Sequence, residues 1–157
     1  MTLATEKPHR LDAILDDAQV IAHFNSQMAI ETENKTLDER RLQKGVEAIL
    51  SDPSKGLYFV AEMNGAVVGQ VMITYEWSDW RNGTFWWIQS VYVEPRVRGT
   101  GVFKSMFEHI HTLASGHRDV CGLRLCVDEN NARARQTYER LGMKHSHYRM
   151  YEIDFVL

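Results

Sequence analysis

The chain has few cysteines, few prolines and no block of charge of one sign. It contains 2 cysteines and 3 prolines in 157 residues, and its formal net charge is −3. Cys121 and Cys126 have an odd spacing, which puts them on opposite faces of a strand, so we expect reduced, buried thiols rather than a disulfide. Without a cluster of lysines or arginines, the sequence offers no electrostatic footprint for nucleic acid or an anionic membrane. Any phosphate must therefore be bound locally.

Long apolar runs are also missing from the sequence. The first residues, Met1 to Pro8, are polar and resemble neither a signal sequence nor a membrane span. We therefore expect a cytoplasmic protein with no membrane partner. A length of 157 residues with 44% hydrophobic residues fits one compact domain, 1–157, whose core runs from about His9 to Phe155.

The first third of the sequence predicts one strand and two helices. His9 to Leu15 can form a strand, and Asp16 then offers an N-cap to a helix whose apolar residues recur at helical spacing. Thr36 with Glu39 three residues later is a capping-box pattern, which predicts a second helix ending before Pro53.

The next third predicts an antiparallel meander. Three β-rich runs are separated by Asn64-Gly65 and by a loop that holds Asn82-Gly83, which are hairpin signals. The runs are Leu57 to Glu62, Val67 to Trp77 and Phe85 to Val93.

The last third returns to alternating helices and strands. A helix is predicted after Gly101, a strand at Leu123 to Val127, a helix at Ala132 to Leu141 stopped by Gly142, and a final strand at Tyr148 to Phe155. The full order is β-α-α-β-β-β-α-β-α-β. It predicts an α/β (α+β) fold with a mixed central sheet.

The segment after Val93 has the pattern of an anion-binding loop. A strand leads into a turn containing Gly99 and Gly101 and then into a helix, whose first N–H groups can bind an anion. Arg96 and Arg98 can add charge. The pattern R-x-x-G-x-G is neither a Walker A loop nor G-x-G-x-x-G, which disfavours the binding of a dinucleotide or a nucleoside triphosphate. A turn that merely requires two glycines would have the same spacing.

A second polar pair lies on the predicted helix at Ala132 to Leu141. Asn131 stands near its start, and Tyr138 follows two turns later on roughly the same face. Taken alone, Asn131 would be a helix cap and Tyr138 a core contact.

With both segments in view, the chain resembles the GNAT superfamily of N-acetyltransferases. The family's phosphate loop has Arg or Gln, two residues, Gly, one residue, then Gly or Ala. Its second signature has Asn, Ala three residues later and Tyr seven later, followed by Leu-Gly-Phe. The matching residues here are Arg96, Gly99, Gly101, Asn131, Ala134, Tyr138 and Leu141-Gly142. Met143 and Phe103 depart from the pattern, and Phe103 leaves the local packing of the loop open.

The resemblance implies an acetyl-CoA cosubstrate in a V-shaped cleft between the strands ending at Val93 and Val127. The Val91 N–H would polarise the thioester carbonyl. Tyr138 would act as the general acid that protonates the departing thiolate. The residues expected to bind acetyl-CoA are Val91, Val93, Arg96, Arg98, Gly99, Thr100, Gly101, Val102, Phe103 and Asn131.

The general base is less clear from the sequence. Deprotonating an alkyl amine with a pKa of about 10.4 costs about 4 to 5 kcal/mol at pH 7. The strand before the loop has Gln89 and Ser90 but no carboxylate. The candidates are Glu31, Glu33, Glu76, Asp79 or a water chain, of which we favour the water chain.

Four tryptophans near the meander loop give two alternatives. They can form an aromatic wall for an ammonium group, or simply pack on strands, which is the more common case. Glu33, Trp77, Asp79 and Gln89 are the residues expected to bind the acceptor.

Three functions remain open from the sequence. The first is an N-acetyltransferase that acts on a primary amine of a small molecule or peptide, and the second is a GNAT-fold acetyl-CoA sensor without turnover. The third, a phosphate-binding regulator that does not bind CoA, requires the match to the family's motifs to be accidental. The acceptor is not identified. We expect no metal, because the histidines spread around a helix, and the resemblance makes a homodimer one further expectation.

Overall fold

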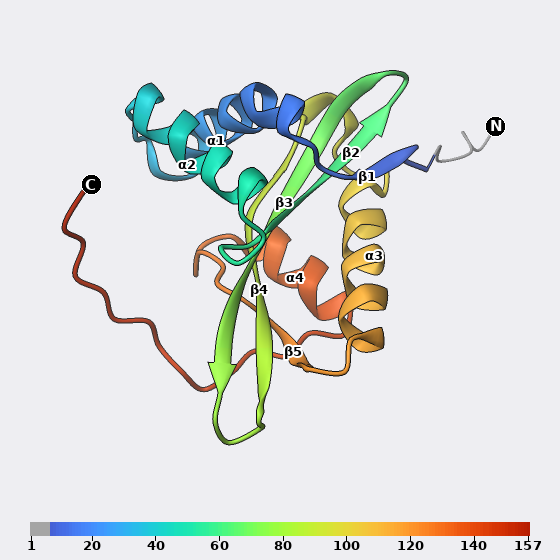
Figure 1. Cartoon of the computed structure of the whole chain (residues 1–157), viewed down its shortest axis with the longest axis vertical. Helices are drawn as coiled ribbons and strands as arrows, with labels where there is room; N and C mark the ends of the chain where they lie inside the picture. The colour runs from blue at the N-terminus through green and yellow to red at the C-terminus, as the bar shows by residue number, and fades with distance from the viewer. Residues whose placement is uncertain (1–6) are drawn as a thin grey trace. The chain divides into compact units, whose positions relative to one another are not determined.

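The computed structural model describes residues 7–157. The chain divides into two compact units, one that extends to Cys126 and one that covers Val127–Leu157. Figure 1 gives the order of the elements along the chain.

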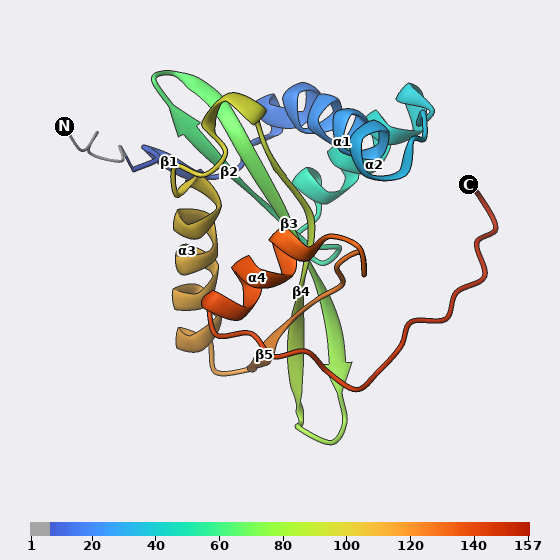
Figure 2. The same cartoon turned by 180° about the vertical axis from the view of Figure 1, so that it is seen from behind.

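The first unit is built on one five-stranded mixed sheet in the order β1-β2-β3-β4-β5. The first three pairings are antiparallel, and β4 pairs with β5 in parallel. Figures 1 and 2 show β3 and β4 as long neighbouring strands. The predicted meander and mixed sheet are confirmed. The strands are β1 (Arg10–Asp12), β2 (Leu57–Met63), β3 (Ala66–Ser78), β4 (Gly83–Val93) and β5 (Val120–Leu125).

Helices cover this sheet and complete its core. Helix α1 packs on β3, β4 and α2, whereas α3 contacts β2, β3, β4 and β5. Ile21 of α1, Val60 of β2 and Met106 of α3 are fully buried. Among residues 7–157, no helix is long and apolar enough to cross a bilayer. The helices of this unit are η1 (Leu15–Asp17), α1 (Ala18–Glu33), α2 (Glu39–Ser51), η2 (Pro95–Val97) and α3 (Val102–Gly116).

The start of the first unit differs from the sequence prediction. Strand β1 ends at Asp12, and Leu15–Asp17 form a 3-10 turn, so Asp17 and not Asp16 precedes α1. The Asp17 carboxylate accepts hydrogen bonds from the Arg10 guanidinium at 2.6 and 2.9 Å. Burial alone would raise the pKa of Asp17, but the bonds from Arg10 and from the Ile14 N–H lower it. This ion pair ties the 3-10 turn to β1, which in turn pairs with β2.

The N-cap of α2 also differs from the predicted capping box. Asp38 is the N-cap, and its Oδ1 accepts a hydrogen bond from the Arg41 N–H at 2.7 Å. Thr36 lies outside the helix. An aspartate caps a helix as well as a threonine does. Asp38, which directly precedes α2, therefore takes the N-cap position.

The second unit contains α4 (Ala132–Arg140) and an extended C-terminal segment. Gly142 has a φ of 92°, which confirms it as the residue that stops the helix. The predicted final strand is wrong: Tyr148 to Phe155 forms no strand in residues 7–157. A strand exists only through hydrogen bonds to a neighbour, and no other strand belongs to this unit.

The two cysteines are free thiols. The expectation that both are buried is wrong, because Cys121 is half-buried and Cys126 is exposed. Strand β5 ends at Leu125. Cys126 therefore lies beyond the last paired residue, where the strand no longer covers its side chain.

Candidate functional site

Strand β4 contains a bulge near its carboxyl end. Met72 of β3 pairs with Gln89, and Gln70 pairs with Tyr92, so Ser90 and Val91 stand opposite Val71 alone. Ser90 has a φ of 49°, which is uncommon for a residue other than glycine. A bulge of this kind leaves a backbone group outside the ladder and re-aims it. The bulge therefore includes Val91, whose N–H is expected to contact the thioester carbonyl of acetyl-CoA.

The other side of β4 loses its partner at the same place. The pairing of β4 with β5 ends at Ile88 and Leu125, whereas β4 itself continues to Val93. Over Gln89 to Val93, β5 therefore offers no backbone partner, and an extended ligand can pair there as a strand would. Val91 and Val93, which the resemblance implies bind acetyl-CoA, both lie in this stretch.

A buried polar network holds the bulge. The Gln70 side chain is 0% exposed, and its Nε2 donates to the Asn25 Oδ1 at 2.8 Å and to the Ser90 carbonyl at 3.1 Å. The Asn25 Nδ2 in turn donates to the Tyr58 hydroxyl at 3.1 Å. The Gln70 Oε1 is buried and has no hydrogen-bond partner among the described residues. The sequence analysis missed this network, although a glutamine within the apolar run Val67 to Ile73 was a signal for it.

Replacing Gln70 with methionine should loosen the bulge while keeping the side-chain volume. The loss of its bonds, each contributing about 0.5 to 1.5 kcal/mol, should reduce turnover by about three- to tenfold. Steady-state kinetics with acetyl-CoA would measure the change, with a thermal melt as the control for folding. Unaltered turnover in a folded variant would show that the bulge does not depend on Gln70.

The loop after β4 has the geometry that the sequence predicts. Pro95–Val97 form a 3-10 turn, and Gly99 and Gly101 have φ values of 78° and 93°. Gly101 is the N-cap of α3, whose first helical bond runs from the Ser105 N–H to the Gly101 carbonyl at 3.0 Å. The N–H groups of the first turn of a helix have no acceptor within the helix and favour an anion.

Arg98 links this loop to α1. Its Nε donates to the Val93 carbonyl and its Nη2 to the Glu31 Oε2, both at 2.8 Å. The Tyr92 hydroxyl donates to the Glu31 Oε1 at 3.3 Å. Both Glu31 oxygens are therefore engaged, which does not favour Glu31 as a free base. Arg98 fixes the start of the loop.

The remaining loop residues are exposed. Arg96 pairs with Glu94 at 2.5 Å, and its side chain is 62% exposed. The Thr100 hydroxyl donates to the Val97 carbonyl at 2.7 Å, so it closes the turn. Arg96 is therefore the cation of the loop with the most freedom to meet a phosphate.

Candidate acceptor residues gather at the β3–β4 hairpin. Glu76 pairs with Arg124 of β5, whose guanidinium lies 3.7 Å from the Phe85 ring centre. The Asp79 Oδ1 accepts from the N–H of Trp80 at 2.9 Å, and the Trp77 side chain is 62% exposed. The pairing with Arg124 disfavours Glu76 as a free base, and Trp77 leaves an aromatic face open.

Two further candidates make local contacts. Glu33, at the end of α1, pairs with Lys35 at 3.1 Å, and both side chains are more than half exposed. The exposed Gln89 side chain donates to the Thr74 hydroxyl. Neither contact engages a buried partner, so both side chains can reorient toward an acceptor.

Asn131 and Tyr138 belong to the second unit, whereas the loop belongs to the first. The Asn131 Oδ1 accepts from the Ala134 N–H at 3.1 Å, which makes Asn131 the N-cap of α4. Tyr138 is half-buried, and burial raises the pKa of its hydroxyl above the usual 10.0. The hydroxyl therefore keeps its proton at neutral pH and can donate it.

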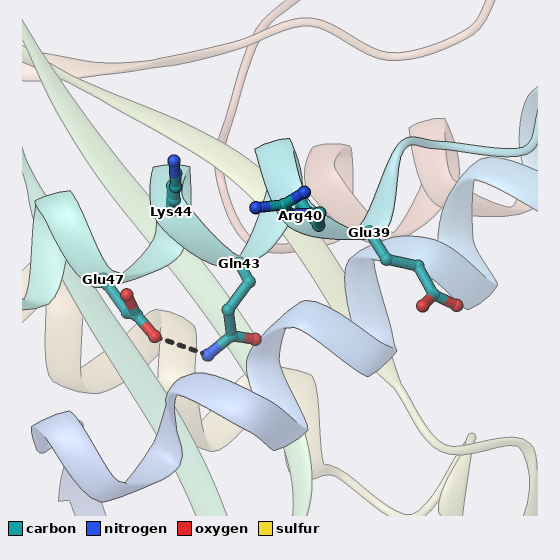
Figure 3. Close-up of a pocket in the computed structure, with 5 residues that line it drawn as sticks. All are labelled: Glu39, Arg40, Gln43, Lys44 and Glu47. Atoms are coloured by element: carbon teal, nitrogen blue, oxygen red, sulfur yellow. Dashed lines mark hydrogen bonds between the residues drawn. The ribbon is translucent and has the colours of Figure 1, made fainter.

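A separate hollow lies on α2. Figure 3 shows that five residues of this helix alone line it, and the Gln43 side chain donates to Glu47 at 2.8 Å. The lining residues are Glu39, Arg40, Gln43, Lys44 and Glu47. None of them is a predicted site residue, and one helix face does not make an enclosed pocket. In residues 7–157, no group of three histidine, cysteine or acidic residues could hold a metal.

The chain is similar to known proteins in its sequence family and its fold. The model of the acetyltransferase (GNAT) family matches residues 18–143. A possible acetyltransferase from Clostridium difficile 630 is 45% identical, with a TM-score of 0.87 over 97% of this chain and 100% of that one. No sequence among the curated proteins matches the chain.

Two more distant structures share the fold. A predicted acetyltransferase with acetyl-CoA from Clostridium acetobutylicum is 17% identical, with a TM-score of 0.74 over 90% of this chain and 93% of that one. The ribosomal-protein-alanine N-acetyltransferase from Brucella melitensis biovar Abortus 2308 is 20% identical, with a TM-score of 0.72 over 92% and 96%.

Proposed function

Since the chain belongs to the GNAT family of acetyltransferases, we propose that it transfers the acetyl group of acetyl-CoA to a primary amine of a small molecule or peptide. The observation that carries the proposal is the bulge at Ser90 and Val91, followed directly by the two-glycine loop and α3. The bulge provides a backbone donor for a thioester, and the loop provides N–H groups for a pyrophosphate.

The reaction is a direct attack of the amine nitrogen on the thioester carbon. The Val91 N–H stabilises the negative charge that develops on the carbonyl oxygen. The C–N bond forms, the C–S bond breaks, and Tyr138 gives its proton to the departing CoA thiolate. The amine proton leaves to solvent, and Tyr138 regains its proton from water.

A water chain accepts the amine proton in this proposal. Two of the candidate carboxylates, Glu31 and Glu76, are each paired with an arginine, and Glu33 is paired with Lys35. Strand β4 itself carries no carboxylate between Gly83 and Val93. This lack also supports the second candidate, a sensor that binds acetyl-CoA without turnover.

We place the acceptor beside the segment Met28 to Asn34, because Glu31 of this segment bonds Arg98 near the Val91 end of β4. The other expected boundary, the loop Trp77 to Thr84, lies at the opposite end of β4, about 23 Å of strand from Val91, so an amine bound there could not reach the thioester. A product-bound structure would test this placement. An acceptor that lies away from Met28 to Asn34 would overturn it.

The function is tested by pairing calorimetry with a turnover assay. Acetyl-CoA should bind, and free CoA should be released with one class in a panel of polyamines, amino acids, aminoglycosides and peptide N-termini. Binding without release for the whole panel would favour the sensor. No binding of acetyl-CoA would overturn both candidates.

A further inference from the structure

Three buried polar side chains meet at the bulge of β4. Asn25, Tyr58 and Gln70 are 6%, 7% and 0% exposed, and buried polar groups of this kind are stable only when they are hydrogen-bonded. Ser90, the bulge residue that they contact, is partly exposed. Through Ser90 the buried network therefore reaches the surface beside Val91.

A backbone carbonyl fixes the directions of the hydrogen bonds in this network. The Gln70 Nε2 lies 3.1 Å from the Ser90 carbonyl oxygen, which can only accept, so the Gln70 amide has one orientation. The same Nε2 lies 2.8 Å from the Asn25 side chain, so the atom that faces it must be Oδ1. The Asn25 Nδ2 then donates to the Tyr58 hydroxyl oxygen at 3.1 Å. The proton of the Tyr58 hydroxyl therefore points away from Asn25.

The Ser90 side chain is the other hydrogen-bonding neighbour of the Tyr58 hydroxyl. Burial raises the pKa of Tyr58, and the hydrogen bonds with Asn25 and with the Ser90 side chain oppose that rise. Because the Asn25 Nδ2 offers no lone pair, the Tyr58 hydroxyl donates to the Ser90 oxygen. Ser90 thus accepts from the network and points its own proton outward. Hydrogen bonds in such a chain polarise one another, which makes the Ser90 hydroxyl a stronger donor.

The backbone of Ser90 gives an independent reason to assign it a role. Four residues other than glycine have a positive φ, and three of them are asparagines, which adopt this region more readily than most residues. Ser90, with a φ of 49°, is the fourth. A glycine or an asparagine would adopt this conformation at a lower cost, and uncommon conformations of this kind cluster at functional sites.

We propose that the Ser90 hydroxyl is a second hydrogen-bond donor to the thioester carbonyl oxygen of acetyl-CoA, beside the Val91 N–H; this role rests on the proposed function. The two donors belong to consecutive residues of one bulge. Two oriented donors stabilise the negative charge that develops on this oxygen better than one does. Ser90 keeps its proton throughout, so the bonds that form and break in the acetyl transfer are unchanged.

Infrared spectroscopy of bound acetyl-CoA, isotope-labelled at the thioester carbonyl, tests this role without turnover. Hydrogen bonds to a carbonyl oxygen lower its stretching frequency, so the frequency should fall when acetyl-CoA binds the full chain. In Ser90→Ala it should return part of the way toward the value of free acetyl-CoA, with the affinity nearly unchanged. The same frequency in both proteins would overturn the role of Ser90. Failure of the wild-type chain to bind acetyl-CoA would instead overturn the proposed function.

Turnover provides the second measurement. Ser90→Ala should lower kcat by about tenfold or more, which is less than the roughly 10²- to 10³-fold loss for an oxyanion-hole donor in an enclosed site, because water can enter at a partly exposed residue. Ser90→Gly also lacks the hydroxyl but adopts a positive φ easily, so an equal loss there would exclude backbone strain as the cause. Full turnover in either variant would overturn the proposal.

Ser78→Ala is the matched control for these variants. The Ser78 hydroxyl accepts a hydrogen bond from Arg81 at 3.3 Å, and Ser78 pairs with Gly83 at the far end of the β3–β4 hairpin. The variant should keep the wild-type kcat and carbonyl frequency. A loss equal to that of Ser90→Ala would overturn the assignment to Ser90.

A double-mutant cycle tests whether the network orients Ser90. Tyr58→Phe keeps the ring and removes the hydroxyl, so it should lower kcat less than Ser90→Ala does. Added to Ser90→Ala, it should lower kcat no further, because residues that act through one another are not additive. Losses that multiply would overturn Tyr58 as the residue that orients Ser90.

Acceptors with different amine pKa values separate this role from that of a proton relay. A donor to the thioester oxygen should contribute the same factor whichever amine attacks, so the loss in Ser90→Ala should be constant across a series of acceptors. A loss that grows with the pKa of the amine would make Ser90 a relay for the amine proton and would overturn the proposal.

Discussion

Valine at Gly99 or at Gly101 is expected to weaken acetyl-CoA binding by about tenfold or more, on the order of 1.4 kcal/mol. Both glycines have φ in the left-handed region, at 78° and 93°, where a β-branched residue is strongly disfavoured. Valine would therefore shift the loop and move the N–H groups of α3 away from the pyrophosphate. Calorimetry with acetyl-CoA measures the loss.

Gly65→Val is the matched control for this prediction. Gly65 also has a positive φ, 76°, but lies in the β2–β3 hairpin, where an added Cβ meets no atom within 4 Å. This variant should lower the thermal stability without changing the affinity. Wild-type affinity in both loop variants would remove the loop as the phosphate site, and an equal loss in Gly65→Val would attribute the effect to general destabilisation.

The elements predicted well from the sequence are those defined by local signals. The turn Asn64-Gly65 fixes its hairpin because both residues adopt positive φ, at 52° and 76°. The loop glycines likewise need a backbone that few other residues can adopt. Each of these features depends on residues adjacent in the chain, so no knowledge of the tertiary structure was needed to predict them.

The features that the sequence did not predict depend on distant partners. The bulge at Ser90 relies on a shift in register and on Gln70, which lies 20 positions away. Glu31 is a candidate base from the sequence alone, but it is paired with Arg98, which lies 67 positions away. The alternation in Tyr148 to Phe155 predicted a strand that this segment does not form, because periodicity does not tell which edge, if any, a strand joins.

Replacing Tyr138 with phenylalanine is expected to lower turnover by about 100-fold, at the low end of the roughly 10²- to 10⁴-fold range for general acid catalysis. The low end applies because a CoA thiol, with a pKa near the roughly 8.5 of cysteine, is a better leaving group than an alcohol. Burial raises the pKa of the Tyr138 hydroxyl, which keeps the acid protonated at neutral pH. Phenylalanine keeps the ring and removes only the donor, so folding and acetyl-CoA affinity should change little.

Tyr75→Phe is the control, since Tyr75 is a tyrosine of β3, 37% exposed, whose pKa is also raised by burial. It should turn over at the wild-type rate. The assay requires an acceptor concentration at which chemistry limits the rate, because slow product release would hide the loss. If Tyr138→Phe keeps full turnover under that condition, water protonates the thiolate and Tyr138 is structural. If its affinity for acetyl-CoA falls as much as its turnover, the hydroxyl binds the donor rather than acting as the acid.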